Sequence, residues 1–124
     1  MSEDHARAST ARVWLAVRLY AEGRTLEEIA SRLPDLRWGA KGAVGVCEEQ
    51  ARAVLAAGLR LLLGRVLRDE RPEGLPEELW PPPTVREEVR SARGRAADAR
   101  RRRALRAWIE SRRPEGGRGG NPAP

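Results

Sequence analysis

Apolar residues recur at helical spacing in the N-terminal third of the chain. The first such segment is residues 10–22, which begins at a possible cap, Thr10, and ends before Gly23. The second begins with Thr25 and has Glu28 three residues later, which is the spacing of a capping box. The apolar residues that share a face in these two predicted helices are Val13, Leu15, Val17, Leu19, Tyr20, Leu26, Ile29, Ala30 and Leu33.

A third and longer stripe follows a glycine-containing segment, which we expect to form a long turn or a loosely formed helical start. It predicts a helix from about residue 44 to about residue 68. Gly58 and Gly64 weaken this helix locally, or mark places where another helix packs close to it. Its apolar positions are Val44, Cys47, Ala51, Val54, Leu55, Leu59, Leu62 and Val66.

Residues 69–83 contain five prolines, which predict an extended connector with at most one turn, around residues 77–80. Thr84 and Glu87 then repeat the capping-box spacing and predict a separate helix. Its apolar anchors are Val85, Val89, Leu105, Trp108 and Ile109. The sequence therefore predicts an all-α protein with a three-helix unit, a proline-rich linker, a basic helical arm and a disordered tail, in residues 1–68, 69–83, 84–113 and 114–124.

Charge is distributed unevenly over these parts. The chain has 24 basic and 18 acidic residues, a net charge of +6 and a sequence pI near 11.0. Residues 86–113 hold 11 arginines against 4 acids, a local balance of +7. Arg100, Arg101, Arg102 and Arg103 lie within about one helical turn, so we expect them to contact phosphates independently of sequence. A solvated surface helix is the alternative.

Several functional classes lack the residues that they need. Cys47 is the only cysteine and His5 the only histidine, so a disulfide within the chain, a Cys/His zinc site and a serine triad are excluded. The segment GAKGAVG lacks the Lys-Ser/Thr ending of a P-loop. We therefore expect no enzymatic activity, no metal and no cofactor, and we interpret Cys47 as a small buried hydrophobe. No apolar run is long enough for a membrane span and the N-terminus is polar, which indicates a cytoplasmic protein.

The segment LYAEGRTLEEIASRL resembles the first two helices of the helix-turn-helix superfamily, as seen in sigma-factor-like domains, response-regulator output domains, resolvases and phage small terminase subunits. The matching residues are Leu19, Gly23, Thr25, Glu28, Ile29, Ala30 and Leu33. In this motif the small Ala30 leaves room for the following helix, while Ile29 and Leu33 fill the core. The resemblance implies binding to double-stranded DNA.

The chain departs from that family after the second helix, where PDLRWGAKGAVG replaces a tight turn. Arg37, Lys41 and Trp38 flank the start of the third helix, so they are the candidates for contacts in a DNA groove. The alternative is a solvated loop with a core tryptophan.

Three functions remain open at this point. The first is a small transcriptional regulator that recognises a DNA sequence. The second is a phage small terminase subunit, whose layout of helix-turn-helix, connector and downstream helices is similar. The third is a helical adaptor that binds proteins through its Leu-rich helix and the patch of Leu105, Trp108 and Ile109. We also expect a homo-oligomer, a dimer or larger, because a small partner covers the long apolar stripe only in part.

Overall fold

The computed structural model describes residues 3–36 and 43–114. These residues form five α-helices and one short 3-10 turn, and among them there is no strand, only an isolated bridge between Pro34 and Val44. The elements are α1 (Glu3–Ala21), α2 (Leu26–Arg32), α3 (Glu48–Arg68), η2 (Glu77–Leu79), α4 (Pro83–Ser91) and α5 (Ala97–Ser111). The predicted all-α fold is therefore confirmed.

The turn between α1 and α2 forms as its sequence predicts. Gly23 has a φ of 95° and its amide donates to the Tyr20 carbonyl at 3.1 Å. The Thr25 hydroxyl accepts from the Glu28 amide at 3.1 Å, and the Glu28 carboxylate accepts from the Thr25 amide at 2.9 Å, which completes the capping box. The predicted start of the first helix is wrong, because α1 begins seven residues before Thr10, with no proline or glycine to stop it.

The chain between α2 and α3 folds back on itself. The amides of Gly45 and Val46 donate to the carbonyls of Leu33 and Ala30 at 2.8 and 2.9 Å. Residues 43–46 thus use their backbone groups to return along the end of α2, and α3 begins at Glu48 rather than near residue 44. Ala30 is buried at this point, with 4% of its surface exposed.

Cys47 corrects a further expectation. It is exposed, and its Sγ accepts from the Gln50 amide at 3.4 Å, so it is the N-cap of α3 rather than a buried hydrophobe. Val44, the first position of the predicted stripe, is 65% exposed. The first two positions of the stripe therefore lie outside the helix that the remaining positions form.

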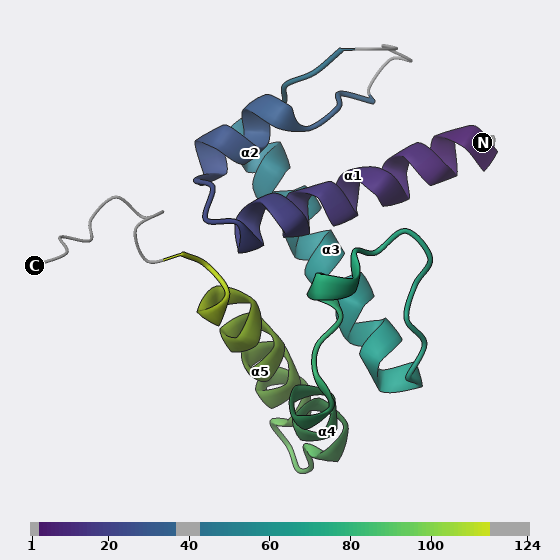
Figure 1. The fold of residues 1–124 in the computed structure, drawn as a ribbon, viewed down its shortest axis with the longest axis vertical. Coiled ribbons are helices and arrows are strands. Elements are labelled where there is room, and N and C mark those ends of the chain that lie inside the picture. The colour runs from purple at the N-terminus through teal and green to yellow at the C-terminus, as the bar shows by residue number, and fades with distance from the viewer. Residues whose placement is uncertain (1–2, 37–42, 115–124) are drawn as a thin grey trace, which may run out of the picture.

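Helix α3 is the centre of the fold and contacts each of the other four α-helices (Figure 1). A Cβ at Gly58 would lie 2.7 Å from Val17 Cγ2 and 2.9 Å from the Val13 carbonyl oxygen, so only glycine permits this close crossing of α1 and α3. Gly64 has no such role, because the nearest atoms belong to Arg68 of the same helix, 3.6 Å away. Of the predicted stripe, Ala51, Val54, Leu62 and Val66 are buried.

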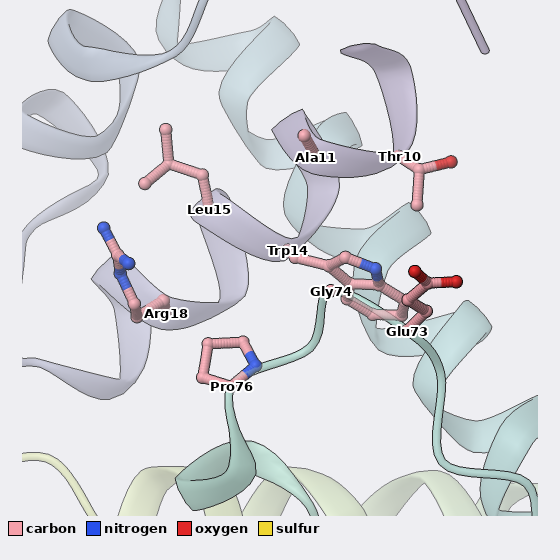
Figure 2. A pocket seen from close by; sticks show the side chains of 8 residues that line it. All are labelled: Thr10, Ala11, Trp14, Leu15, Arg18, Glu73, Gly74 and Pro76. Carbon is pink, nitrogen blue, oxygen red and sulfur yellow. The ribbon is translucent and has the colours of Figure 1, made fainter. Parts of the chain in front are cut away.

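The connector makes the predicted turn, η2, and also a turn at residues 72–75, where the Leu75 amide donates to the Pro72 carbonyl at 3.4 Å and Gly74 has a φ of 87°. The expectation of at most one turn is therefore wrong. Buried Leu75, Leu79 and Pro81 fix the connector to the core. Trp14 of α1, which is 5% exposed, lies against Gly74 of the connector (Figure 2). The connector is thus anchored to the core at its buried residues, while residues between them, such as Arg71 and Glu77, are exposed.

The C-terminal segment differs from the predicted single, separate helix. It consists of α4 and α5, which are joined through a turn at Gly94 with a φ of 93°. Three of its five predicted anchors, Val89, Leu105 and Ile109, are buried in the same apolar cluster as residues of α1 and α2, and the other two are half-buried. The division of the chain into units at residues 68, 83 and 113 stays a prediction.

The predicted capping box at Thr84 and Glu87 is wrong. Helix α4 begins at Pro83 with Pro82 as its N-cap, so Thr84 already lies inside the first turn and caps nothing. The amide at the first position of a helix has no acceptor within the helix, so proline loses nothing there by lacking an N–H, and its fixed φ already suits the helix. Pro83 is therefore a favourable helix start without a side-chain cap.

Candidate nucleic-acid interface

The packing of α5 on α3 brings arginines from both helices to one surface. Burial of Leu105 and Ile109 fixes the rotation of α5, so that Arg102 and Arg106, one turn apart, lie beside Arg60 of α3 around a common groove. Arg103 follows on the outer side of α5, where it lines a neighbouring cleft together with Arg106. We call this set the basic face: Arg60, Arg102, Arg103 and Arg106.

All four residues of the basic face are exposed, and none makes a hydrogen bond or ion pair within the described part of the chain. Acids are not absent from the surroundings, because Glu88 and Glu110 line the same cleft as Arg103. Glu110 accepts a hydrogen bond from the Tyr20 hydroxyl at 2.8 Å. The guanidinium groups of the basic face are therefore available to an anionic ligand.

The predicted phosphate-binding run of four arginines is divided by the structure. Arg101 donates from Nε to the Val89 carbonyl and from Nη2 to the Ala92 carbonyl, each at 3.2 Å. Its third contact is with the Asp98 carboxylate at 3.0 Å, so Arg101 satisfies the C-terminal carbonyls of α4. Arg100 donates to the Arg93 carbonyl at 2.9 Å and remains exposed. Only Arg102 and Arg103 of the run belong to the basic face.

The other predicted contact residues, Arg37, Trp38 and Lys41, lie outside the described residues. The described segments on either side, ending at residue 36 and resuming at residue 43, are held together by the backbone bonds that return the chain to α3. Whether these three side chains contact DNA stays a prediction.

The beginning of α3 carries acids rather than bases. Glu48 and Glu49 occupy its first turn, where they suit the positive end of the helix dipole. In a groove-reading helix the same carboxylates would face phosphates and repel them. The electrostatics therefore favour the basic face over the N-terminus of α3 as the surface that meets an anion.

Sequence reasoning missed Arg60 and Arg106. The spacing of Arg102 and Arg106 was a visible signal, since residues four apart on a helix are neighbours. Arg60 had no such signal, because it reaches the basic face only through the packing of α5 on α3.

A second cleft of about 730 Å³ lies between α1 and the connector (Figure 2). Trp14, Arg18 and Glu73 are among its lining residues. The indole Nε1 of Trp14 is buried and has no hydrogen-bond partner in the described residues. Its mixed charge distinguishes this cleft from the basic face.

Among the described residues, Tyr20 and Glu28 have shifted pKa values, and both lie outside the basic face. Partial burial, and then the hydrogen bond to Glu110, raises the pKa of Tyr20. The hydrogen bond from the Thr25 amide lowers the pKa of Glu28. Both shifts report on contacts that hold helix ends.

Comparisons with protein-family models, with curated proteins and with solved structures give no match. The helix-turn-helix resemblance accordingly rests on the residues alone. In residues 3–36 and 43–114, no helix has the length and apolar character needed to cross a membrane.

Proposed function

We propose that the protein binds double-stranded DNA and that the basic face contacts the phosphate backbone. The observation that carries this proposal is the convergence of four exposed arginines, from α3 and α5, that have no carboxylate partner in the described residues. Guanidinium groups suit phosphate because their planar donors match its oxygens in pairs. Contacts of this kind give affinity and orientation without sequence preference.

Sequence recognition is the finer part of the proposal. The helix-turn-helix resemblance assigns it to Arg37, Trp38 and Lys41, and it makes a small transcriptional regulator the leading function. Replacing Arg37 and Lys41 with Gln should change discrimination between duplexes, because a base-edge contact is worth about 1–3 kcal/mol only at its matching base. Equal losses on all duplexes would assign these residues to phosphate contact instead.

Salt dependence tests the basic face directly. The variant R102Q/R103Q/R106Q should bind every duplex more weakly, and its slope of log affinity against log salt should fall by up to about 3, close to one for each arginine that no longer neutralises a phosphate. The matched control is R52Q/R71Q/R95Q, which removes the same charge from exposed arginines outside the basic face. Equal losses in both variants would show an effect of net charge alone, and unchanged binding in the first would refute the proposal.

A phage small terminase subunit is a second candidate, and it differs from a regulator chiefly in assembly. We propose self-association, as a dimer or larger, for the regulator and for the terminase subunit alike. It is supported by Leu61 and Leu67 of α3, which remain 46% and 40% exposed and offer apolar surface to a second copy. Sedimentation with and without duplex DNA separates the possibilities, since a packaging subunit should form a ring of many copies. A monomer at tens of micromolar would refute self-association.

A further inference from the structure

The groove between α3 and α5 has an apolar floor inside its ring of arginines. It encloses about 300 Å³, a volume suited to the side chains of a partner rather than to a whole helix. The floor residues are Ala56, Leu59, Leu63 and Leu105, and the rim residues are Arg60, Arg102 and Arg106. Phosphate binding alone does not account for this apolar floor, because contacts to the DNA backbone are polar.

The apolar surface continues along α3 beyond the groove. Leu59, Leu63 and Leu67 are spaced four residues apart and therefore lie on one face of the helix. The first two are half-buried and Leu67 is 40% exposed. The result is an open strip of leucines that is flanked by positive charge on the side of α5.

We propose that this groove binds an acidic amphipathic helix of another protein. Leucine-type anchors at helical spacing would enter the floor, and carboxylates beside them would meet the three rim arginines. This inference goes beyond DNA binding because it uses the leucine floor. Arg60, Arg102 and Arg106 belong to both surfaces, so the acidic helix and the duplex compete for them.

Charge complementarity selects this occupant over a second copy of the chain. A two-fold partner related by an axis through the groove would place its own Arg60, Arg102 and Arg106 opposite the same three residues, and like charges across an interface oppose association. An acidic helix offers charges of the opposite sign and an apolar face at once. It matches both parts of the groove.

Three peptides test the proposal on the full-length protein. The probe is a fluorescein-labelled amphipathic peptide of about 16 residues, with leucines on one helical face and glutamates beside them. The second peptide has the same composition, with its leucines scattered around the helix, and the third has Gln in place of Glu. The probe should bind and the scattered peptide should not, while the neutral peptide should bind about 2- to 5-fold more weakly for each ion pair with an arginine that it cannot form. Failure of the probe to bind, or equal binding of all three, overturns the proposal.

Matched variants locate the binding site. Leu63→Glu should weaken probe binding by at least about tenfold, because it places a carboxylate in the apolar floor. Ala53→Glu is the control, since Ala53 is an exposed apolar residue of the same helix that does not line the groove. Circular dichroism checks that both variants fold. If Leu63→Glu does not fold, Arg60→Gln gives a milder test of the same site, with Arg71→Gln as its control. Equal effects within either pair would place the peptide elsewhere.

Two further variants separate this inference from DNA binding. Leu63→Asn adds no charge beside the rim arginines, so it should weaken peptide binding and keep most of its duplex affinity. Arg103→Gln, outside the groove, should lose duplex affinity and keep the peptide. Unlabelled duplex should displace the peptide if both proposals hold. A protein that binds the probe but no duplex would refute the proposed function and leave the groove assignment standing.

Discussion

Arginines on α4 and on α5 belong to one basic segment of the chain, yet they have opposite roles. Arg86 and Arg90 of α4 each reach the Asp69 carboxylate at 3.2 Å, and their side chains are only 21% and 32% exposed. Arg102 and Arg106 of α5 are exposed and have no such partner in the described residues. A local charge of one sign therefore does not locate a binding surface; the acids and carbonyls within reach of each arginine decide it.

The same contrast exists between adjacent residues. Arg101 turns toward the end of α4, and Arg102 turns toward the groove, because successive residues of a helix differ by about 100° in direction. One arginine thus joins two helices while its neighbour faces a ligand. If this distinction holds energetically, substitutions of the two kinds of arginine should differ in their effect on stability.

The largest expected effect comes from Arg101. Arg101→Ala leaves the carbonyls of Val89 and Ala92 without their donor, and hydrogen bonds to charged groups are worth about 1.5–3 kcal/mol each. Because water partly replaces the donor, we expect the free energy of unfolding in urea to fall by about 2–3 kcal/mol in total. Arg103→Ala is the control and should change it by no more than about 0.5 kcal/mol. Similar losses in both variants would remove the distinction between joining and exposed arginines.

Asp69 should have the next largest effect. It ends α3 in the left-handed conformation, with a φ of 55°, and it holds both arginines of α4. Asp69→Asn keeps a residue that tolerates this conformation and removes the charge, so we expect a loss of about 1 kcal/mol that diminishes at high salt. Denaturant unfolding at low and high salt measures it. A loss that salt does not alter would mean that the ion pairs contribute nothing.

The two capping-box sequences show how far the chain could be predicted from its sequence. Thr25 and Glu28 form the box because a glycine turn leaves the helix no earlier start. Thr84 has the same spacing to Glu87, but Pro83 begins the helix one residue earlier. Local signals thus predicted the helical class and most helix positions, and failed where a neighbouring signal was stronger.

The candidate site was less predictable than the fold. Four adjacent arginines in the sequence suggested one surface, but their individual directions depend on which face of α5 is buried. The floor of the groove joins Leu59 and Leu105, which are far apart in the chain and meet only through tertiary packing. Such convergence has no local signature.

The surroundings of Tyr20 predict a pH effect, which the charge of Arg113 opposes. Arg113 donates to the carbonyls of Tyr20 and Arg24 and stacks on the Tyr20 ring, with its Cζ 4.2 Å from the ring centre. Burial and the Glu110 bond raise the pKa of Tyr20, so the folded protein favours the neutral phenol. This contribution to stability is complete below the unfolded pKa of about 10 and is lost as pH rises through the higher folded pKa.

Thermal unfolding across this pH range measures the effect. Wild type should lose stability above a pH of about 10, and Tyr20→Phe should lose less over the same range. Tyr20 is the only tyrosine and Lys41 the only lysine, so few other side chains titrate there. Equal alkaline losses in both proteins would show that the hydroxyl does not contribute.

The smallest expected effect has the opposite sign and lies on the basic face. Arg103 has Arg100 and Arg106 three residues away on either side, and like charges at this spacing destabilise a helix by about 0.2–0.5 kcal/mol per pair. Arg103→Gln should therefore raise the free energy of unfolding by up to about 0.5 kcal/mol at low salt, and the gain should vanish at high salt where the repulsion is screened. Urea unfolding at the two salt concentrations measures it, with Arg71→Gln as the control for loss of one exposed charge. A decrease in stability would mean that Arg103 has a favourable contact within the protein, and it would then belong with Arg86 and Arg101 rather than with the arginines available to a ligand.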